Sequence, residues 1–202
     1  MPPGSKPSSG GIAASDATAI VARTLDAAAA LHQRMRGLDL APVAAAADAI
    51  RAALAAGNQL LAFGNGGSAA DAQHLTTELV GRFQKERPGF AAVPLTADSS
   101  LLTSLANDFG FERIFARQIE ALGRAGDVAF AISTSGTSPN VVRALETARD
   151  RRLRTIALTG RDGGTAGKLA EIHINVPDDC TARVQEVHIT LIHAICELVE
   201  RD

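Results

Sequence analysis

From residue 59 onward, strand-length apolar runs alternate with segments of helical periodicity, and this alternation constrains the fold more than any other feature of the chain. The apolar runs lie at 59–63, 90–95, 128–133, 154–159 and 171–176, and the helical stretches between them include 69–83, 98–107 and 139–151. Such alternation is typical of an α/β protein with a parallel, doubly wound sheet. In such sheets ligands bind beyond the carboxyl ends of the strands, so we expect the functional site there.

The residue pattern within the strands refines this prediction. Runs such as VAFAIS at 128–133 are almost continuously apolar, which is expected when helices cover both faces of a sheet. The last run, EIHINV at 171–176, alternates instead, so we place it toward an edge. The chain has 202 residues, 46% of them apolar, which is enough for one sizeable core around five strands.

Two helices are predicted before the alternating region. Apolar positions recur at helical spacing over 16–36 and 42–56, with Ser15 as the expected cap of the first helix and Gly57 as the stop of the second. The first fourteen residues are rich in Gly, Ser and Pro and predict a disordered leader. We therefore expect a leader over 1–14 and a single domain over 15–202 that includes both helices.

Charge and cysteine content restrict the class of ligand. The formal net charge is −2 and the basic residues are scattered, so the sequence predicts a small-molecule ligand and neither a nucleic-acid nor a membrane partner. Cys180 and Cys196 form no CxxC motif, and Cys196 lies in an apolar segment where a buried thiol is expected. No apolar run reaches the length of a membrane span. These features predict a cytoplasmic protein.

Two turns rich in glycine and serine follow the first and third predicted strands. GNGGS at 64–68 precedes a helix with Ser68 as its expected cap, and STSGTSPN at 133–140 places Ser138 as a cap and Pro139 at the first helical position. Either turn alone could simply be a tight connection. Because two occur at matching strand ends before helix N-termini, we favour a phosphate site. The GxxxxGK[ST] and GxGxxG patterns are absent, which disfavours ATP and NAD.

The helix predicted after the first turn has a polar face. A rotation of about 100° per residue places Asp71, His74, Glu78 and Arg82 together, opposite an apolar face that ends in Phe83. His74 and Glu78, four residues apart, can present an imidazole and a carboxylate to one metal ion, or a carboxylate base to a substrate. The alternative for this face is plain solvation.

The C-terminal segment also has helical periodicity and carries two of the five histidines. His188 lies beside the apolar stripe, where a hydrogen-bonded core histidine is the default interpretation. His193 falls on a polar face, for which solvent exposure is the simplest interpretation. We expect His32 and His173 at the surface, His173 because it alternates with apolar neighbours.

Five elements occur in a recognisable order along the chain: GNGGSAADAQH at 64–74, Glu78, AND at 106–108, STSGTSPN at 133–140 and QEVHITLIH at 185–193. Together they resemble the phosphoheptose isomerases of the sugar isomerase (SIS) fold, over about 41–200. The resemblance implies a flavodoxin-like SIS sheet of five parallel strands. It also implies that sedoheptulose 7-phosphate is converted to D-glycero-D-manno-heptose 7-phosphate, the first step toward ADP-heptose and other nucleotide-activated heptoses.

The resemblance further implies roles for individual residues. Glu78 and His193 are the implied acid–base pair, Glu78 removing a proton and His193 serving the other end of the reacting carbons. The implied phosphate ligands are Ser133, Thr134, Ser135 and Ser138. The remaining implied substrate-binding residues are Asn65, Gly66, Gly67, Ser68, Asn107, Asp108 and Gln185, together with Glu78.

Some members of this family bind zinc, and the matching ligands are His74, Glu78, Gln185 and His193, for one ion per subunit. On one helix Gln185 and His193 are separated by ~12 Å along the axis, which is too far for a single ion. If both serve one site, neighbouring subunits must supply different residues. Together with the resemblance, this predicts a homotetramer with active sites at the subunit interfaces.

Two other functions fit parts of the sequence. A related non-catalytic SIS protein binds the bacterial replication initiator, but in that branch the positions of Glu78 and His193 hold residues unable to transfer protons. An SIS enzyme or sensor for another phosphosugar, such as N-acetylmuramic acid 6-phosphate or an arabinose phosphate, would share the phosphate turns, but QEVHITLIH is less expected there. Ala182 stands where some isomerases carry an acidic residue, so no side-chain role is assigned there.

Overall fold

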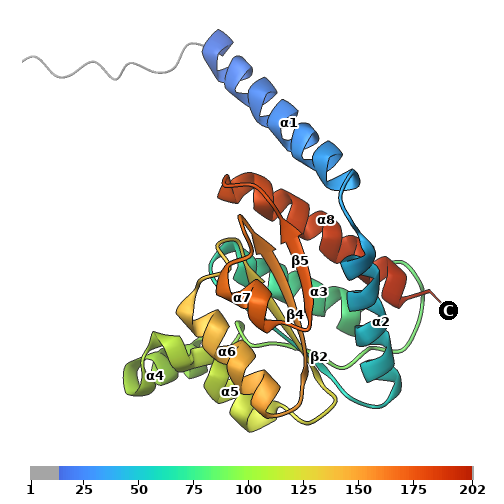
Figure 1. Cartoon of the computed structure of the whole chain (residues 1–202), viewed down its shortest axis with the longest axis vertical. Helices are drawn as coiled ribbons and strands as arrows, with labels where there is room; N and C mark the ends of the chain where they lie inside the picture. Colours follow the sequence, from blue (N-terminus) through green and yellow to red (C-terminus); the bar gives the residue numbers. More distant parts are fainter. Residues whose placement is uncertain (1–13, 202) are drawn as a thin grey trace, which may run out of the picture.

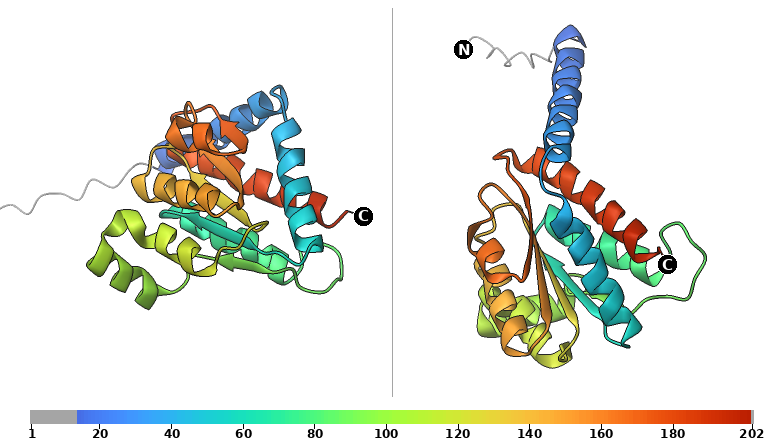
Figure 2. Two further views of the ribbon diagram at one scale, coloured as in Figure 1. Left: turned by 60° about the horizontal axis from the view of Figure 1, so that its bottom comes forward. Right: turned by 45° about the vertical axis from the view of Figure 1, so that its right-hand side comes forward.

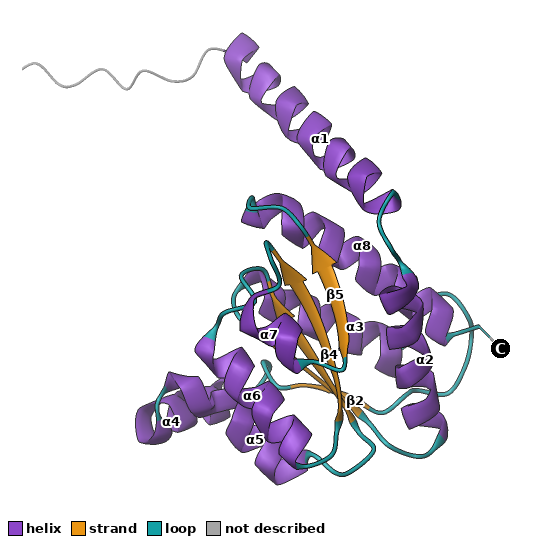
Figure 3. Cartoon of the chain, viewed as in Figure 1, coloured by secondary structure: helices purple, strands orange, loops and turns teal. Residues whose placement is uncertain are grey.

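Five parallel strands form one sheet in the order β2-β1-β3-β4-β5, which confirms the predicted doubly wound, flavodoxin-like sheet. The computed structural model describes residues 14–201. The strands, orange in Figure 3, are β1 (Leu60–Gly64), β2 (Ala92–Pro94), β3 (Val128–Ser133), β4 (Arg154–Gly160) and β5 (Ile172–Val176). The alternating run forms the edge strand β5, as expected. The chain runs outward from β1 to β2 and then returns to β3 on the other side of β1, so the crevice between β1 and β3 is the switch point where ligands bind.

Helices cover both faces of this sheet (Figure 1). Helices α2, α3 and α8 pack on one face, and α5, α6 and α7 pack on the other. The helical elements are α1 (Ala14–Arg36), α2 (Ala41–Ala55), α3 (Gly67–Val80), α4 (Ser99–Phe109), the 3-10 turn η1 (Phe111–Arg113), α5 (Ile114–Leu122), α6 (Pro139–Asp150), α7 (Gly164–Leu169) and α8 (Thr181–Val199). The predicted helical stretches correspond to α1, α2, α3, α4, α6 and α8, whereas α5 and α7 were not among them.

Successive strand residues contribute to two separate cores, one on each face of the sheet. Leu60 and Phe130 face α2, α3 and α8, whereas Phe63 and Ala129 face α5 and α6. The rings of Phe63 and Phe115 lie 5.5 Å apart in the second core. Because both faces of each central strand are buried, apolar residues occupy consecutive positions and no alternation is visible in the sequence.

Helix α1 extends away from the sheet (Figures 1 and 2), and it contacts α8 both at its middle, where Arg183 donates to the carbonyl oxygen of Thr24, and nearer its C-terminus, where His32 bonds Thr190. Among its described residues, Leu31 and Met35 are the buried ones. Ser15 lies inside the helix instead of capping it, because the helix already begins at Ala14. Apart from Ala14, the predicted leader lies outside the described residues. Among residues 14–201, no helix is both long and apolar enough to cross a membrane.

Glu200, directly after α8, ties the C-terminus to the loop that follows α3. Its carboxylate accepts hydrogen bonds from the backbone N–H groups of Phe83, Gln84 and Lys85, and from Nε of Arg87. Burial opposes ionisation of this carboxyl, but the three backbone donors and the Arg87 guanidinium outweigh it. The pKa of Glu200 is therefore lowered from 4.5 to about 2.

We expect acid to weaken this connection within a defined pH window. Because the pKa is lower in the folded chain, ionised Glu200 stabilises the fold fully above pH 4.5, and this stabilisation is lost as the pH falls toward about 2. Urea unfolding of the wild type and Glu200→Gln should therefore give a difference in unfolding free energy that shrinks across this window. Glu197→Gln, the same exchange in the last turn of α8, controls for general loss of a carboxylate. A Glu200→Gln difference that stays constant from pH 6 to pH 2 would contradict the assignment.

Candidate active site

The turns that follow β1 and β3 meet at the carboxyl edge of the sheet. Asn65 and Asn140 join them, since each amide Nδ2 donates to the Oδ1 of the other at 2.8 Å. A hollow of about 70 Å³ lies between the turns, lined by Asn65, Ser68, Ile132, Ser133, Thr134 and Ser138. The two predicted phosphate turns thus border one small polar hollow.

The turn after β1 depends on glycine. A Cβ at Gly64 would lie 2.7 Å from the carbonyl oxygen of Ile132, so the backbone of this turn approaches β3 as only glycine allows. Gly66, with a φ of +55°, is the N-cap of α3. The positive φ lets the helix begin at Gly67, earlier than predicted. Ser68 is therefore not the cap; it lies buried in the first turn of α3.

Hydroxyl groups converge in the turn after β3. Ser133 Oγ lies 3.4 Å from Ser135 Oγ and 3.2 Å from Ser138 Oγ, and it accepts a hydrogen bond from Gly136 N–H. Ser138 is the N-cap residue of α6 and Pro139 its first residue, as predicted. Within the described chain, however, the Ser138 hydroxyl is bonded to Ser133 and not to a backbone N–H of α6. These hydroxyl groups and the N-terminus of α6 border the same hollow, an arrangement that suits an anion.

A second cluster lies where α3 packs against α8. Nε2 of His74 is 3.3 Å from Oε1 of Glu78 and 2.9 Å from Nε2 of His193. The ring of Phe83 stacks on His193 with the centroids 5.5 Å apart. His193 is therefore half-buried, and the solvent-exposed interpretation is wrong. One ligating atom from each of His74, Glu78 and His193 lies within 4.8 Å of the other two, and we call these three residues the acid–base cluster.

Helices α3 and α8 run parallel, and this alignment separates two predicted ligands. Gln185 lies against the start of α3, where a Cβ on Gly67 would overlap its amide group. His193, about two turns further along α8, contacts His74, about two turns further along α3. Within one chain, Gln185 therefore lies beside the GNGGS turn and His193 belongs to the acid–base cluster.

The structure contains only part of the polar face predicted for α3. Burial raises the pKa of Asp71 to about 6, and the neighbouring His74 opposes this shift. Among the described residues, the buried Oδ2 of Asp71 has no hydrogen-bond partner. Arg82 lies beyond the end of α3 at Val80 and pairs with Glu86 at 3.8 Å, so it leaves the face predicted for it.

Asn107 and Asp108 lie on an exposed part of α4. Nδ2 of Asn107 donates to Oδ1 of Asp108 at 2.8 Å. Helix α4 packs on η1 and α5, on the side of the molecule away from α8 (Figure 1). The described chain thus places this pair outside the acid–base cluster.

The other histidines have structural partners. His188 is fully buried, as predicted, and its Nε2 is 3.0 Å from the carbonyl oxygen of Thr159. Burial lowers the pKa of His188 to about 4. His173 is half-buried beside Gly163 and Gly167, and its Nε2 bonds the Thr159 hydroxyl at 2.7 Å, so its expected place at the surface is wrong. His32 is likewise half-buried: its Nδ1 bonds a backbone carbonyl of α1 and its Nε2 a hydroxyl on α8.

Both cysteines are free thiols, Cys196 buried as predicted and Cys180 exposed. The side chain of Cys196, on α8, packs in the core, where burial raises the pKa of its thiol to about 12.

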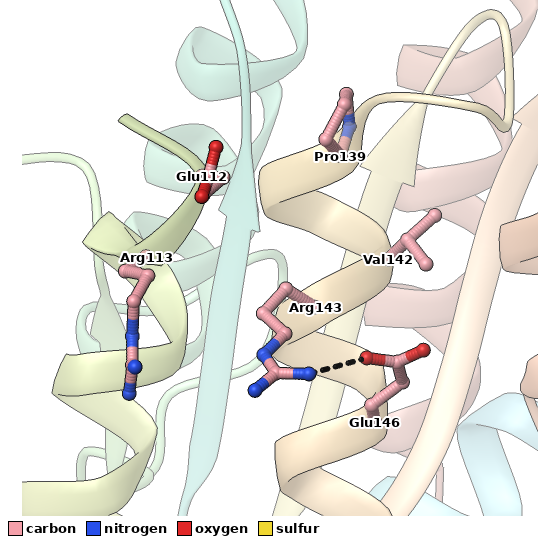
Figure 4. A pocket seen from close by; sticks show the side chains of 6 residues that line it. All are labelled: Glu112, Arg113, Pro139, Val142, Arg143 and Glu146. Carbon is pink, nitrogen blue, oxygen red and sulfur yellow. Dashed lines mark hydrogen bonds and ion pairs between the residues drawn. The ribbon is translucent and has the colours of Figure 1, made fainter. Parts of the chain in front are cut away.

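A larger hollow of about 390 Å³ lies between η1 and the start of α6 (Figure 4). Its two guanidinium groups already have carboxylate partners. Arg143 bonds Glu146 at 3.3 Å, as Figure 4 shows, and Arg113 bonds Glu120 at 3.0 Å. These charges are therefore balanced by carboxylates, whereas the smaller hollow is lined by hydroxyl groups, an amide and Ile132.

Sequence reasoning missed two residues that shape the site. Asn140 is buried and holds Asn65 in place. In the sequence it is marked only by its position directly after Pro139, the first residue of α6. Phe83 was assigned to the apolar face of a longer α3. The helix ends at Val80, and the loop that follows carries the ring of Phe83 onto His193.

The fold is that of an SIS-domain protein, and the SIS domain family matches residues 25–160 of the chain. A phosphoheptose isomerase from Geotalea daltonii is 55% identical over 174 residues, which cover 84% of this chain and 91% of the relative. The structure of the phosphoheptose isomerase from Neisseria gonorrhoeae has a TM-score of 0.86 at 43% identity, covering 91% of this chain and 98% of the other. The enzyme from Francisella tularensis has a TM-score of 0.88 at 33% identity, covering 92% and 99%. The chain belongs to the phosphoheptose isomerase family.

Proposed function

We propose that this chain is the aldose–ketose isomerase that converts sedoheptulose 7-phosphate to D-glycero-D-manno-heptose 7-phosphate, the first step toward nucleotide-activated heptoses. The observation that supports this most directly is the acid–base cluster, in which a carboxylate and two imidazoles from α3 and α8 meet. The relatives that this chain matches over most of their length are phosphoheptose isomerases. We place the reaction in the cytoplasm.

The reaction moves a carbonyl group from C2 to C1 of the sugar. The C1–H bond breaks and its electron pair forms the C1=C2 bond of an enediolate. A proton is then added at C2, while O2 gains a proton and O1 loses one. We assign removal of the C1 proton to Glu78 and delivery of the C2 proton to His193. A positioned base of this kind contributes about 10²- to 10⁴-fold in rate.

The phosphate of the substrate fits the hollow between the two turns. We propose that the hydroxyl groups of Ser133, Thr134, Ser135 and Ser138 hold it at the N-terminus of α6. The sugar would then extend along the start of α3, past Asn65, Gly66, Gly67 and Ser68 and the amide of Gln185. Because Asn107 and Asp108 are exposed on α4, we propose that they reach the sugar of a neighbouring subunit.

The function is tested by incubating the purified, zinc-supplied protein with sedoheptulose 7-phosphate and following the products by NMR. We expect the resonances of an aldose 7-phosphate to appear. A folded protein that forms none would contradict the proposal. Binding to the bacterial replication initiator, or turnover of N-acetylmuramic acid 6-phosphate or an arabinose phosphate, would then identify the alternative.

The acid–base cluster also has the donor set of a zinc site, and we propose one zinc ion per subunit. Glu78 cannot hold the ion and act as a free base in the same arrangement, so the cluster must rearrange between these two roles. Two imidazole nitrogens and a carboxylate oxygen are ligands that zinc takes, and tetrahedral bonds of about 2.0–2.1 Å put ligand atoms roughly 3.3 Å apart. The 3.3 Å between His74 Nε2 and Glu78 Oε1 fits this spacing, whereas the 2.9 Å between the Nε2 atoms of His74 and His193 is shorter. Gln185 would be the fourth ligand, supplied by a neighbouring subunit. A bound zinc ion would supply Lewis acidity toward the substrate oxygens.

If zinc is part of the site, removing it should lower the isomerisation rate, and this loss should be reversible. We expect thorough chelation to lower the isomerisation rate by at least about tenfold, since a metal ion contributes several kcal/mol to such reactions. Adding zinc back should restore the rate. The readouts are metal content by elemental analysis and turnover by NMR, and metal-free protein with full activity would exclude zinc from the mechanism.

We also propose a homotetramer whose subunits share their active sites. The separation of Gln185 from the acid–base cluster in one chain supports shared sites, and the exposed Ile20, Val21 and Leu25 on α1 offer an apolar surface for association. Sedimentation should give the mass of four 20.9-kDa chains. An active monomer would contradict the shared site.

A further inference from the structure

Arg87 and Glu200 form an ion pair near the C-terminal ends of α3 and α8, beyond the acid–base cluster. The proposed reaction gives this ion pair no role. The side chains are 11% and 3% exposed, and Nε of Arg87 donates to Oε1 of Glu200 at 3.1 Å. A buried ion pair is not stabilising by itself, because desolvation offsets the attraction. What these two residues contribute therefore depends on what their other hydrogen bonds hold in place.

Arg87 binds the backbone at the end of α3 and Glu200 binds the backbone of the loop that follows. We call the ion pair with these backbone bonds the Arg87–Glu200 clamp. Nη2 of Arg87 donates to the carbonyl oxygen of Glu78 at 2.9 Å, and Nη1 donates to that of Leu79 at 2.8 Å. The last carbonyls of a helix lack partners within the helix, and Arg87 supplies them here. The guanidinium is itself held from the other side, since it lies 4.0 Å from the centroid of the Phe90 ring.

Glu200 holds the loop that follows α3. Its carboxylate binds three consecutive N–H groups, the first of them that of Phe83 at 2.8 Å. The Phe83 ring stacks on the imidazole of His193 at an interplanar angle of 25°. Glu200 is the C-cap of α8 and follows His193 by seven residues, a helical spacing that places the two residues on the same side. The loop between α3 and β2 is thus anchored to α8 at two points, the carboxylate of Glu200 and the ring of His193.

We propose that Arg87, Glu200 and Phe83 are positioning residues for the isomerisation. The clamp fixes the end of α3, so that the Phe83 ring holds the His193 imidazole against His74 and Glu78. This inference rests on the proposed function, in which Glu78 and His193 transfer the protons. Displacing a reacting group by about 1 Å can lower a rate by about 10²-fold, so the geometry of this support matters to the chemistry.

Two variants test this positioning role, one at Phe83 and one at Glu200. Phe83→Leu removes the stacked ring and leaves the clamp, whereas Glu200→Gln disturbs the clamp and leaves the ring. The matched controls are Phe111→Leu, at an exposed phenylalanine on η1, and Glu171→Gln, which also breaks a glutamate–arginine ion pair but lies directly before β5. We expect kcat to fall by about tenfold or more in both test variants while KM stays within about twofold, because the phosphate turns are untouched. The controls should match the wild type.

A second readout does not depend on activity. In metal-free protein labelled with ¹³C at the histidine Cε1, the five histidines can be followed by NMR, and His193 is assigned by comparison with His193→Gln. Phe83→Leu should shift the His193 resonance because the stacked ring is gone. Glu200→Gln, which alters no contact of His193 itself, should shift the same resonance in the same direction. Glu171→Gln should leave it in place.

The outcomes separate this inference from the proposed function. A folded Glu200→Gln protein with wild-type kcat and an unmoved His193 resonance would overturn the positioning role. If Glu200→Gln does not fold, Phe83→Leu decides: a lower kcat at unchanged KM supports the role, and an unchanged kcat overturns it. If the wild type fails to isomerise the sugar, the proposed function is wrong, and the His193 resonance still tests whether the clamp positions that ring.

Discussion

Glu78→Gln is expected to bind sedoheptulose 7-phosphate with near-normal affinity and to convert it about 10²- to 10⁴-fold more slowly than the wild type. Glutamine keeps the shape of the side chain but cannot accept the C1 proton. The phosphate turns after β1 and β3 remain intact, so KM should change little. His193→Gln should show a similar loss, because the enediolate then lacks its proton donor at C2.

The measurement is turnover by NMR, together with exchange of the C1 hydrogen in D₂O, which reports proton removal alone. Glu86→Gln is a suitable control, because it makes the same exchange in a carboxylate that is 94% exposed on the loop after α3. Glu78→Gln should lose both C1 exchange and turnover. Full exchange in that variant would show that another group is the base.

Gly136→Ala is expected to destroy the phosphate turn. Gly136 has a φ of +64°, and a left-handed conformation alone costs a non-glycine residue about 1–3 kcal/mol. In addition, the new methyl group would overlap the carbonyl oxygen of Gly163 and lie 2.9 Å from the nitrogen of Gly164. These are backbone atoms, so the turn has to move. We expect a large loss of unfolding free energy and loss of inorganic phosphate binding.

Gly57→Ala provides the matched control for this variant. Gly57 also has a positive φ, +81°, but nothing lies within 4 Å of an added Cβ. It should therefore report the cost of the strained backbone alone, with phosphate binding and turnover unchanged. Urea unfolding and phosphate titration of both variants separate strain from overlap. Equal destabilisation with retained phosphate binding in Gly136→Ala would contradict the close packing described here.

The parts of the fold that could be predicted are those controlled by local pattern. The apolar run at 128–133 coincides with β3, and the alternating run at 171–176 is the edge strand β5. His188 and Cys196 are buried because they lie in or beside a continuous apolar stripe. Each of these features depends on residues close together in the sequence, where periodicity is informative.

The parts that could not be predicted depend on partners distant in the sequence. Helical periodicity continues through Phe83, but α3 stops at Val80, and the following loop is held by Glu200, more than a hundred residues later. Asn140 is recognisable only through its pairing with Asn65. His173 follows the alternation of an exposed strand, yet α7 covers it. In each case tertiary contacts override the local pattern.

The parallel alignment of α3 and α8 has a consequence for how this chain can change length. Gly67 faces Gln185 and His74 faces His193, so the two helices keep nearly the same register between these contacts. One inserted or deleted residue within either interval would rotate every later side chain of that helix by about 100°. His193 or Glu78 would then point out of the cluster. The eight-residue spacing from Gln185 to His193 therefore cannot change by one residue without loss of the site.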